Sequence, residues 1–392
     1  MHPIMSATVI ITPVEAERRH LNRKDYVPCV DAFIDCRLPG SMPKENYSMI
    51  GPGVTQNASQ FINLQEPHGF NIGAAGMYPG VTNNLHLHFT SETFIVPTGA
   101  YTLRWGVRGD EGELPLEAGD IAVMPTWVFR GFSTASEQFG LLMTVLGGDD
   151  TGGIIWSPDV LKRARETGLW LSKDNEVIDT TLTGVVPAAD ELLPLMPEAE
   201  IAALKRWSVA QMRARIVTKS ELDFRAATLD TAAGHHWKIA PAVGSGLSQH
   251  RDHSPRVLEP QSFSIEWIQI ESGQGSAPFS MTEKMVLINL SPALEVALNT
   301  GTDTVIQTLG FEDMISIPAH ALRSFRCPTG APTSEAVMVI AGDHVKHPAF
   351  SPAVVSKARA NDVTLDAGGK LARASVLPPM MFDTHVGLAA NA

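Results

Sequence analysis

The sequence predicts an all-β protein built from two similar barrels or sandwiches in tandem, with a few connecting helices. Two observations support this prediction. The chain of 392 residues contains a long internal repeat, and within each copy the segments are short, rich in Val, Ile, Phe, Thr and Trp, and separated by Gly, Pro and Asp. Such segments are typical of β-strands joined by turns, and many of them at close spacing are typical of a sandwich or barrel.

The repeat keeps a constant offset of 193 residues over most of its length. Residues 66–70 match residues 259–263, and residues 125–132 match residues 318–325. One residue is inserted in the second copy after these segments, so its last strand is displaced by one position. An internal repeat determines the fold of the whole chain, because each copy is one folding unit. It predicts two domains of the same fold.

The first copy shows the strands most clearly. Residues 86–96 and 101–107 are expected to form a hairpin that turns at 97–99. Between the two copies, residues 158–171 and 197–216 have apolar side chains at helical spacing with charges on the opposite face, which predicts amphipathic helices. Three later strands of the first copy are expected over 121–125, 128–133 and 140–146.

We therefore expect five parts along the chain. The arm and the tail mix Pro, Gly and Ala, and we expect the tail to be partly extended; neither part is informative about the chemistry. The parts are an N-terminal arm (1–59), a first barrel (60–150), a helical linker and arm (151–252), a second barrel (253–345) and a C-terminal tail (346–392).

The composition argues against several classes of protein. Thirty basic and 42 acidic residues give a net charge of −12, so nonspecific binding to nucleic acid or anionic lipid has no electrostatic support. No apolar run approaches the roughly 20 residues that span a bilayer, and the N-terminus lacks the apolar core of a secretory signal. We therefore expect a cytoplasmic protein. Cys29, Cys36 and Cys327 lack CxxC spacing, which favours reduced packing residues over a disulfide or a thiolate zinc site.

Three candidate metal ligands lie close together in the first copy. His86 and His88 are two residues apart, so both side chains project from one face of a strand, and Glu92 has the same parity if the strand continues. Two neutral imidazoles and a carboxylate with open positions suit a mononuclear Fe(II) centre, although Mn, Ni or Zn also accept such ligands. We therefore predict one divalent metal, with iron as the first choice, bound by His86, His88 and Glu92.

The spacing of this segment, G-x5-H-x-H-x3-E-x6-G, matches the first motif of the cupin family at every fixed position. Gly119, Asp120 and Pro125 resemble the start of the second cupin motif. With two copies the chain resembles a bicupin, and the resemblance covers about half of the residues directly. It implies two double-stranded β-helix (jelly-roll) barrels in tandem.

Residues 125–130 further resemble the Pro-x-Trp segment of the gentisate and salicylate 1,2-dioxygenase branch of the bicupins. Where that branch places a third metal-binding His, this chain has Arg130, whose guanidinium has no lone pair to donate. The three-His site is therefore absent, and Glu92, which matches the acidic ligand of germin-like cupins, would complete the ligand set. Arg130 either pairs with Glu92 or binds a substrate carboxylate, and the two roles can coexist.

The second copy lacks the candidate ligands. At the offset of 193, His86 and its two partners become Phe279, Met281 and Met285. A barrel lined by these side chains has no ligands for a hard cation, so we predict that the second barrel binds no metal and is architectural. Arg323 occupies the position of Arg130 in this copy, which favours a structural role for that arginine.

The resemblance implies an iron-dependent dioxygenase that acts on a small aromatic or enolisable organic acid. Its partners would be an anionic small molecule and dioxygen, and its assembly a homodimer or homotetramer. Arg130 would be the catalytic and substrate-binding clamp on a carboxylate. The residues that would form aromatic walls, although strand aromatics are often plain core, are Trp105, Trp127, Phe94 and Phe132.

Two other functions remain compatible with these residues. A metal-dependent lyase, decarboxylase or isomerase would use the same ligands, with the ion polarising a carbonyl group as a Lewis acid. A non-catalytic small-molecule-binding or storage protein would instead keep Glu92 and Arg130 as an internal ion pair. Fold alone does not decide among the three.

Overall fold

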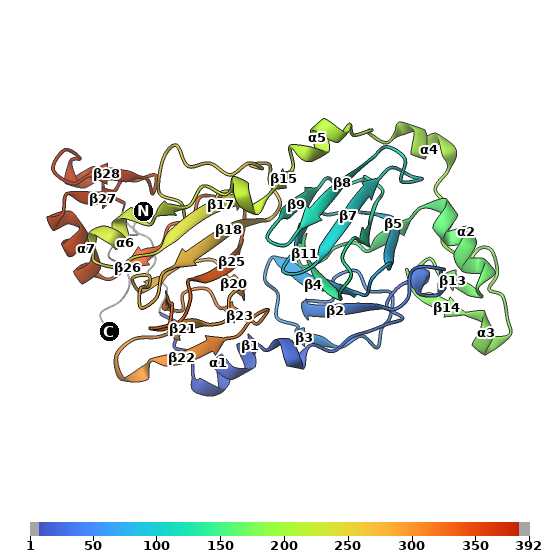
Figure 1. Ribbon diagram of the computed structural model, residues 1–392, viewed down its shortest axis with the longest axis horizontal. Coiled ribbons are helices and arrows are strands. Elements are labelled where there is room, and N and C mark those ends of the chain that lie inside the picture. Colours follow the sequence, from blue (N-terminus) through green and yellow to red (C-terminus); the bar gives the residue numbers. More distant parts are fainter. Residues whose placement is uncertain (1–7, 384–392) are drawn as a thin grey trace. The chain divides into compact units, whose positions relative to one another are not determined.

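The computed structural model describes residues 8–383, and the chain divides into two compact units (Figure 1). Unit 2 is Tyr26–Glu221, and unit 1 combines the chain up to Asp25 with the chain from Leu222 onward. Residues 1–7 of the expected arm and 384–392 of the expected tail lie outside the described residues. Each unit is built from one seven-stranded and one five-stranded sheet, with two further short strands paired outside them. The predicted all-β fold with a few helices is confirmed.

In unit 2 the seven-stranded sheet has the order β15-β9-β6-β11-β4-β2-β3, and all pairs except β2 with β3 are antiparallel. The five-stranded sheet has the order β12-β5-β10-β7-β8. The first sheet comprises β2 (Lys44–Ile50), β3 (Ile62–Leu64), β4 (Phe70–Met77), β6 (Glu92–Ile95), β9 (Ile121–Met124), β11 (Gly140–Gly147) and β15 (Ile216–Val217). The second comprises β5 (Thr82–His88), β7 (Ala100–Trp105), β8 (Gly112–Glu117), β10 (Arg130–Thr134) and β12 (Ile154–Trp156).

Further helices and short strands of unit 2 lie between its strands β12 and β15. Ser157 caps the first helix through its side chain, and a proline occupies the first turn, so both the start and the direction of this helix are encoded locally. These elements are α2 (Pro158–Glu166), β13 (Leu169–Leu171), β14 (Val177–Asp179), α3 (Thr180–Thr183), α4 (Glu198–Ala203) and α5 (Val209–Arg213). The helices expected over 158–171 and 197–216 are longer than the ones observed. The first ends at Glu166, and the second segment contains two short helices, α4 and α5.

Unit 1 repeats this architecture with the sheet orders β1-β23-β20-β25-β18-β17-β16 and β22-β21-β24-β19-β26. The first sheet comprises β1 (His20–Leu21), β16 (Arg225–Ala226), β17 (Lys238–Val243), β18 (Phe263–Ile270), β20 (Met285–Asn289), β23 (Met314–Ile317) and β25 (Ser334–Ala341). The second comprises β19 (Phe279–Ser280), β21 (Leu294–Leu298), β22 (Val305–Leu309), β24 (Arg323–Arg326) and β26 (Ala349–Phe350). Outside them lie α1 (Pro13–Arg19), α6 (Thr228–Ala232), α7 (Pro352–Ala360), β27 (Val363–Leu365) and β28 (Leu371–Arg373).

The register of the strands matches the repeat found in the sequence. Arg130 lies opposite His86 in unit 2, and Arg323 lies opposite Phe279 in unit 1, in both cases at the offset of 193. The turns match as well. Asp149 accepts hydrogen bonds of 2.8 Å from two successive backbone N–H groups, and the carboxylate one residue beyond the offset, that of Asp343, does the same.

The equivalence extends beyond the ranges 60–150 and 253–345. Strand β2, in the expected arm, pairs with β4 and extends the larger sheet, and β12, in the expected linker, pairs with β5. The tail also carries an ordered helix, α7, which is capped by Ser351 as α2 is capped by Ser157. The arm and tail are therefore parts of the two folded units.

The interior of unit 1 is apolar at the positions that correspond to the candidate ligands. Phe279, Met281 and Met285 are buried in one core cluster with Trp237 and Phe325. Phe279 also contacts Trp237 and Phe325 through its ring. Within the described residues, the only group of three His, Cys, Asp or Glu side chains with the spacing of a metal site lies in unit 2.

We predict that the stability of unit 1 depends on the ionisation of Asp230. Burial raises the pKa of this carboxyl group to about 7 from 3.8, so the folded state holds its proton more tightly than the unfolded chain does. Its stabilising contribution is complete below pH 4 and is lost as the pH rises through 7, by roughly 4 kcal/mol at about 1.4 kcal/mol per pKa unit.

Denaturant unfolding of the wild type and of Asp230→Asn between pH 4 and pH 8 measures this effect. The variant should lose less stability across that range than the wild type. Glu266, whose pKa burial also raises to about 7, accounts for a decline that remains in the variant. Parallel curves for the two proteins would contradict the prediction.

Candidate metal centre

The two candidate histidines lie on the inner face of strand β5. His86 and His88 alternate with the buried Leu87, and both imidazoles are almost fully buried, with exposed fractions of 3% and 1%. Strand β5 runs between β10 and β12, so it is held on both edges, with Arg130 and Trp156 both opposite His86. The side-chain alternation predicted from the sequence is therefore present where the ligands are expected.

Glu92 begins strand β6 in the other sheet and faces the histidines. Its Oε1 lies 3.5 Å from Nε2 of His88. Its Oε2 accepts a 3.0 Å hydrogen bond from Nε of Arg130, and Nη2 of Arg130 lies 2.9 Å from the same oxygen. Arg130 also donates through Nη1 to the carbonyl oxygen of Val128 at 3.1 Å. One carboxylate oxygen thus binds the arginine, and the other faces the imidazole of His88.

Both imidazoles have one nitrogen available for a metal. Nδ1 of His86 lies 2.7 Å from the carbonyl oxygen of Asn84, and Nδ1 of His88 lies 3.4 Å from that of Gly153. A carbonyl oxygen only accepts hydrogen bonds, so each Nδ1 carries the proton and each Nε2 keeps its lone pair.

The environment keeps the histidines neutral and the glutamate charged. Burial, His88 and Arg130 lower the pKa of His86 to about 3. Burial and Arg130 also lower the pKa of His88. Burial alone would raise the pKa of Glu92, but Arg130 and His88 outweigh it and hold that pKa well below its usual range. At neutral pH the site therefore offers two neutral imidazoles and one carboxylate, the protonation states that metal binding requires.

The three donors fit a single divalent ion. Their ligand atoms all lie within 4.8 Å of one another. An ion with bonds of about 2.0–2.2 Å holds its ligand atoms up to about 4.4 Å apart, so the donors lie close to the spacing that one ion imposes. Two imidazoles and a carboxylate with open positions suit Fe(II), and imidazole and carboxylate ligands are also used by Mn, Ni and Zn.

A cavity adjoins the candidate ligands. About 50 Å³ of it is open to the centres of water molecules. His86, His88 and Glu92 form part of its wall. The other side chains that surround it include aromatic rings and buried polar groups, among them Phe33, Tyr47, Phe132, Trp156, Lys44, Asn46 and Asn83.

Of the residues predicted to bind the substrate, only Phe132 lines this cavity. Trp105 is fully buried in the core, where its indole N–H donates to the carbonyl oxygen of Trp207. Phe94 packs edge-to-face on Phe132, and of these two rings only Phe132 reaches the cavity. Trp127 is 45% exposed and stacks edgewise on Phe89. Arg130 contacts the site through Glu92 and is itself fully buried.

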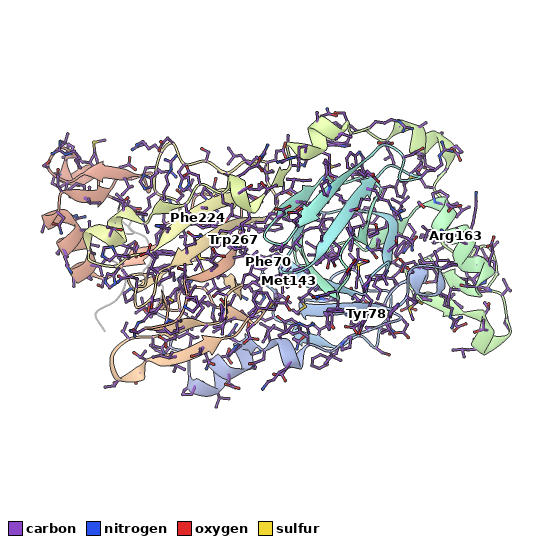
Figure 2. All side chains as sticks on the ribbon, in the orientation of Figure 1. Phe70, Tyr78, Met143, Arg163, Phe224 and Trp267 are labelled. Atoms are coloured by element: carbon purple, nitrogen blue, oxygen red, sulfur yellow. The ribbon has the colours of Figure 1, made fainter. Side chains whose placement is uncertain are left out.

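The sequence did not single out several residues that surround the site. Phe33 and Lys44, which line the cavity, and Asp35 come from the segment expected to be an N-terminal arm, and Trp156 comes from the expected linker. One signal was present, since β5 reads TNNLHLH and two consecutive buried asparagines interrupt the alternation of a strand. Figure 2 shows how densely side chains fill the interior of each unit.

The arginine of the second copy has a different environment. Arg323 is also fully buried, but it donates to the carbonyl oxygens of Pro318 and Ala321 and has no carboxylate within ion-pair distance. Burial lowers its pKa to about 9. The repeat therefore keeps an arginine bonded to the preceding turn in both units, and of these two arginines only Arg130 forms an ion pair with a glutamate of the described residues.

Comparisons with family models and with curated proteins find no match. Among solved structures, hazelnut (Corylus avellana) vicilin matches with 10% identity and a TM-score of 0.50, covering 84% of this chain and 87% of that one. Oxalate decarboxylase from Lactobacillus farciminis, solved as a formate complex, matches with 12% identity and a TM-score of 0.50, covering 88% of each chain.

Oxalate decarboxylase from Bacillus subtilis matches with 9% identity and a TM-score of 0.50, covering 88% of this chain and 79% of that one. These neighbours are bicupins, so the fold of this chain is two cupin barrels in tandem. No helix of the described part of the chain is long and apolar enough to cross a membrane.

We predict unequal costs for removing the two equivalent arginines. Arg130→Met leaves Glu92 charged and buried without its partner, which should lower the free energy of unfolding by about 3–5 kcal/mol. Arg323→Met leaves no carboxylate without its ion-pair partner and should cost less, because only backbone acceptors lose their donors. Denaturant unfolding of both variants without added metal tests this contrast. Equal losses would refute the view that pairing with Glu92 distinguishes the two positions.

Proposed function

We propose that this protein is a metal-dependent lyase that acts on a small carboxylic acid, with decarboxylation as its reaction. The observation that carries this proposal is the arrangement of two neutral imidazoles and one carboxylate, all buried, at the wall of a small cavity. Perturbed titratable groups that converge on a cavity are typical of functional sites.

The size of the cavity favours a small substrate. At about 10–15 Å³ for each water centre, 50 Å³ corresponds to roughly four water molecules. An acid of two to four carbon atoms is of this size. A hydroxylated benzoate together with dioxygen needs more room than the present walls of Phe33, Phe132 and Trp156 leave.

The charges favour an anion. Glu92 and Arg130 neutralise each other, as do the second buried pair, Lys44 and Asp35. Because each pair is neutral overall, a bound divalent ion would give these four side chains and the ion a net charge of +2. A carboxylate is the group that such a site attracts, since opposite charges attract strongly in a buried site of low dielectric constant.

Each residue has a separate task in this proposal. His86 and His88 present their Nε2 atoms, and Glu92 presents Oε1, to one divalent ion. That ion, when bound, supplies Lewis-acid stabilisation for the charge that develops as a carboxylate leaves as carbon dioxide. Arg130 holds Glu92 in its orientation. Trp156 and Phe33 limit the access of water, and the amide of Asn83 offers a donor to the substrate.

The named neighbours agree with this reaction class. Two of the three structures compared above are oxalate decarboxylases, and one of them is a formate complex. Decarboxylation also consumes no oxidant: the bond to the carboxylate carbon breaks, carbon dioxide leaves, and the carbon that keeps the electron pair takes a proton from water. Sequence identity of about 10% carries the fold alone, so the argument depends on the residues of this chain.

A dioxygenase is the second candidate. Two histidines and one carboxylate with open positions are the donor set of many non-haem Fe(II) oxygenases, and residues 125–130 resemble the gentisate and salicylate branch. Dioxygen uptake separates the two reactions, because a decarboxylase turns over without consuming it.

We predict that the purified protein binds one divalent ion per chain and that His86→Ala together with His88→Ala abolishes this binding. Metal analysis and calorimetric titration with Mn(II) measure it. The wild type loaded with Mn(II) or Fe(II) should release carbon dioxide from one of a panel of acids, namely oxalate, malonate, oxaloacetate and acetoacetate, without uptake of dioxygen.

Three outcomes would contradict the proposal. Full metal occupancy in the double variant would exclude the histidines as ligands. Stoichiometric dioxygen uptake with a hydroxylated benzoate would favour the dioxygenase. A metal-loaded protein that turns over neither the acids of the panel nor a hydroxylated benzoate would favour a binding protein.

A further inference from the structure

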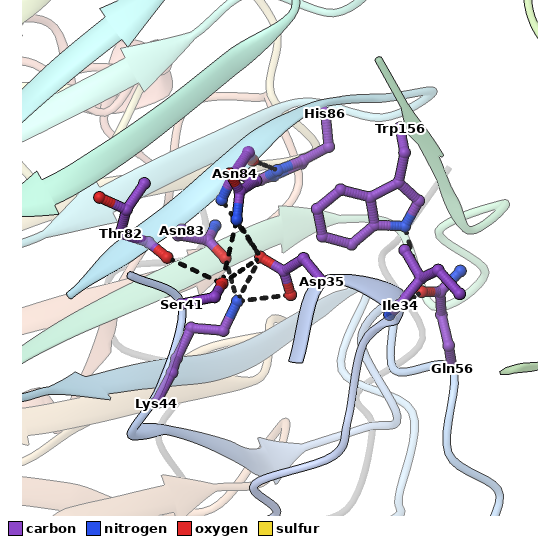
Figure 3. Close-up of polar contacts among 10 residues, drawn as sticks. All are labelled: Ile34, Asp35, Ser41, Lys44, Gln56, Thr82, Asn83, Asn84, His86 and Trp156. Carbon is purple, nitrogen blue, oxygen red and sulfur yellow. Dashed lines mark hydrogen bonds and ion pairs between the residues drawn. The ribbon is translucent and has the colours of Figure 1, made fainter. Parts of the chain in front are cut away.

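A buried ion pair between Lys44 and Asp35 lies next to Asn83 and Asn84, on the strand that carries His86 (Figure 3). Nζ of Lys44 lies 2.8 Å from both carboxylate oxygens of Asp35, and neither residue is more than 4% exposed. Burial raises the pKa of Asp35, but the charge of Lys44 and the surrounding hydrogen bonds outweigh it and hold that pKa below its usual value. Asp35 is therefore a buried, ionised acceptor, and no step of the proposed reaction uses it.

One side of this pair leads to a candidate ligand. Oδ2 of Asp35 accepts hydrogen bonds from the backbone N–H of Asn84 at 3.2 Å, from its side-chain amide at 3.1 Å and from the hydroxyl of Ser41 at 3.0 Å. The carbonyl oxygen of the same Asn84 accepts the 2.7 Å hydrogen bond from Nδ1 of His86. Asp35 thus fixes, by two bonds, the residue that orients the imidazole.

The other side of the pair leads to the cavity. Nζ of Lys44 donates to Oδ1 of Asn83 at 2.8 Å, and Asn83 lines the cavity. Strand β5 has a bulge here, since its register against β10 shifts between His86 and Asn83, which brings both residues to the inner face. Gly131 permits this, because a Cβ at that position would lie 2.5 Å from the carbonyl oxygen of Asn83.

We propose that Asp35 is a positioning residue of the candidate metal centre, which sets the orientation of His86 through Asn84 while Lys44 keeps it charged. This inference rests on the proposed function. The effect is one of geometry, because the N–H and C=O groups of Asn84 belong to different peptide units and are not conjugated with each other. Partners that orient metal-binding histidines typically contribute 10–100-fold to metal affinity.

The second barrel contains a similar clamp without a metal ligand. Asp230 accepts a 2.8 Å hydrogen bond from the backbone N–H of Ala277, which is the equivalent of Asn84 at the offset of 193. Two residues further along is Phe279 in place of His86. Asp230 lies 195 residues after Asp35, two beyond the offset, so the two carboxylates are not at equivalent positions, but both accept a bond from the backbone N–H at equivalent positions of the repeat. Unit 1 therefore supplies a control in which a similar contact cannot affect a metal.

The experiment compares variants in the full-length protein by calorimetric titration with Mn(II) and by the EPR spectrum of bound Mn(II). In the double variant Asp35→Leu, Lys44→Met both charges and the acceptor are lost together, so no buried charge is left unpaired. We expect its Mn(II) affinity to fall 10–100-fold. In Asp35→Asn, Lys44→Met an amide oxygen still faces Asn84, and we expect an affinity within threefold of the wild type.

The control is Asp230→Leu, which removes the similar clamp in unit 1. We expect a lower melting temperature with unchanged Mn(II) affinity and an unchanged spectrum. Should the Asp35→Leu double variant fail to fold, Asn84→Ala decides the question. This variant removes one of the two bonds to Asp35 and leaves the ion pair intact, and we expect a two- to tenfold loss of Mn(II) affinity.

Several results would overturn the inference. Wild-type affinity and spectrum in the Asp35→Leu double variant, or in Asn84→Ala, would exclude a positioning role and leave the proposed function standing. Equal losses in the Leu and Asn forms of the double variant would mean that the ion pair, and not the acceptor, matters. Absence of Mn(II) binding by the wild type would remove both the inference and the proposed function.

Discussion

The candidate site of unit 2 depends on the ion pair between Glu92 and Arg130. A carboxylate buried in a β-barrel is costly unless it is paired and hydrogen-bonded. Arg130 satisfies one oxygen of Glu92 and leaves the other facing His88 at 3.5 Å. Because the guanidinium is anchored to the carbonyl oxygen of Val128, the direction of the free oxygen is fixed. Arg130 thus holds the carboxylate of Glu92 in place at this site.

The two barrels share a frame and differ in what fills it. Gly73 lines the cavity of unit 2, and its equivalent at the offset of 193 is Glu266, whose carboxylate accepts hydrogen bonds from two backbone N–H groups. Lys44 has Trp237 as its equivalent, a core residue that stacks on Phe279. The second barrel is therefore filled where the first is open. A few substitutions at inward positions change a cavity with ligands into a packed interior while the strand register stays the same.

The sequence predicts the parts of this structure that follow from periodicity. The repeat predicts two units of the same fold, and the alternation of side chains along a strand predicts that His86 and His88 lie on one face. The same rule fails at Asn83, because a bulge in β5 changes the face to which that side chain points. It also cannot show how deep an inward side chain lies. Trp105 and Phe94, which the sequence offers as aromatic walls of a substrate site, lie in the hydrophobic core. The contribution of Asp35 depends on a contact 49 residues apart, which no local pattern encodes.

Lys44 explains why the two clamps differ in charge. Burial raises the pKa of Asp230 to about 7, whereas Lys44 reverses that effect for Asp35. A protonated carboxyl group carries a hydroxyl that donates hydrogen bonds, whereas an ionised carboxylate only accepts them. The hydrogen bonds that Asp230 can form therefore change near neutral pH. Asp35 stays ionised there and remains an acceptor for all its donors. A candidate metal ligand needs a constant orientation, and the buried lysine supports it in the unit that carries the candidate ligands His86 and His88.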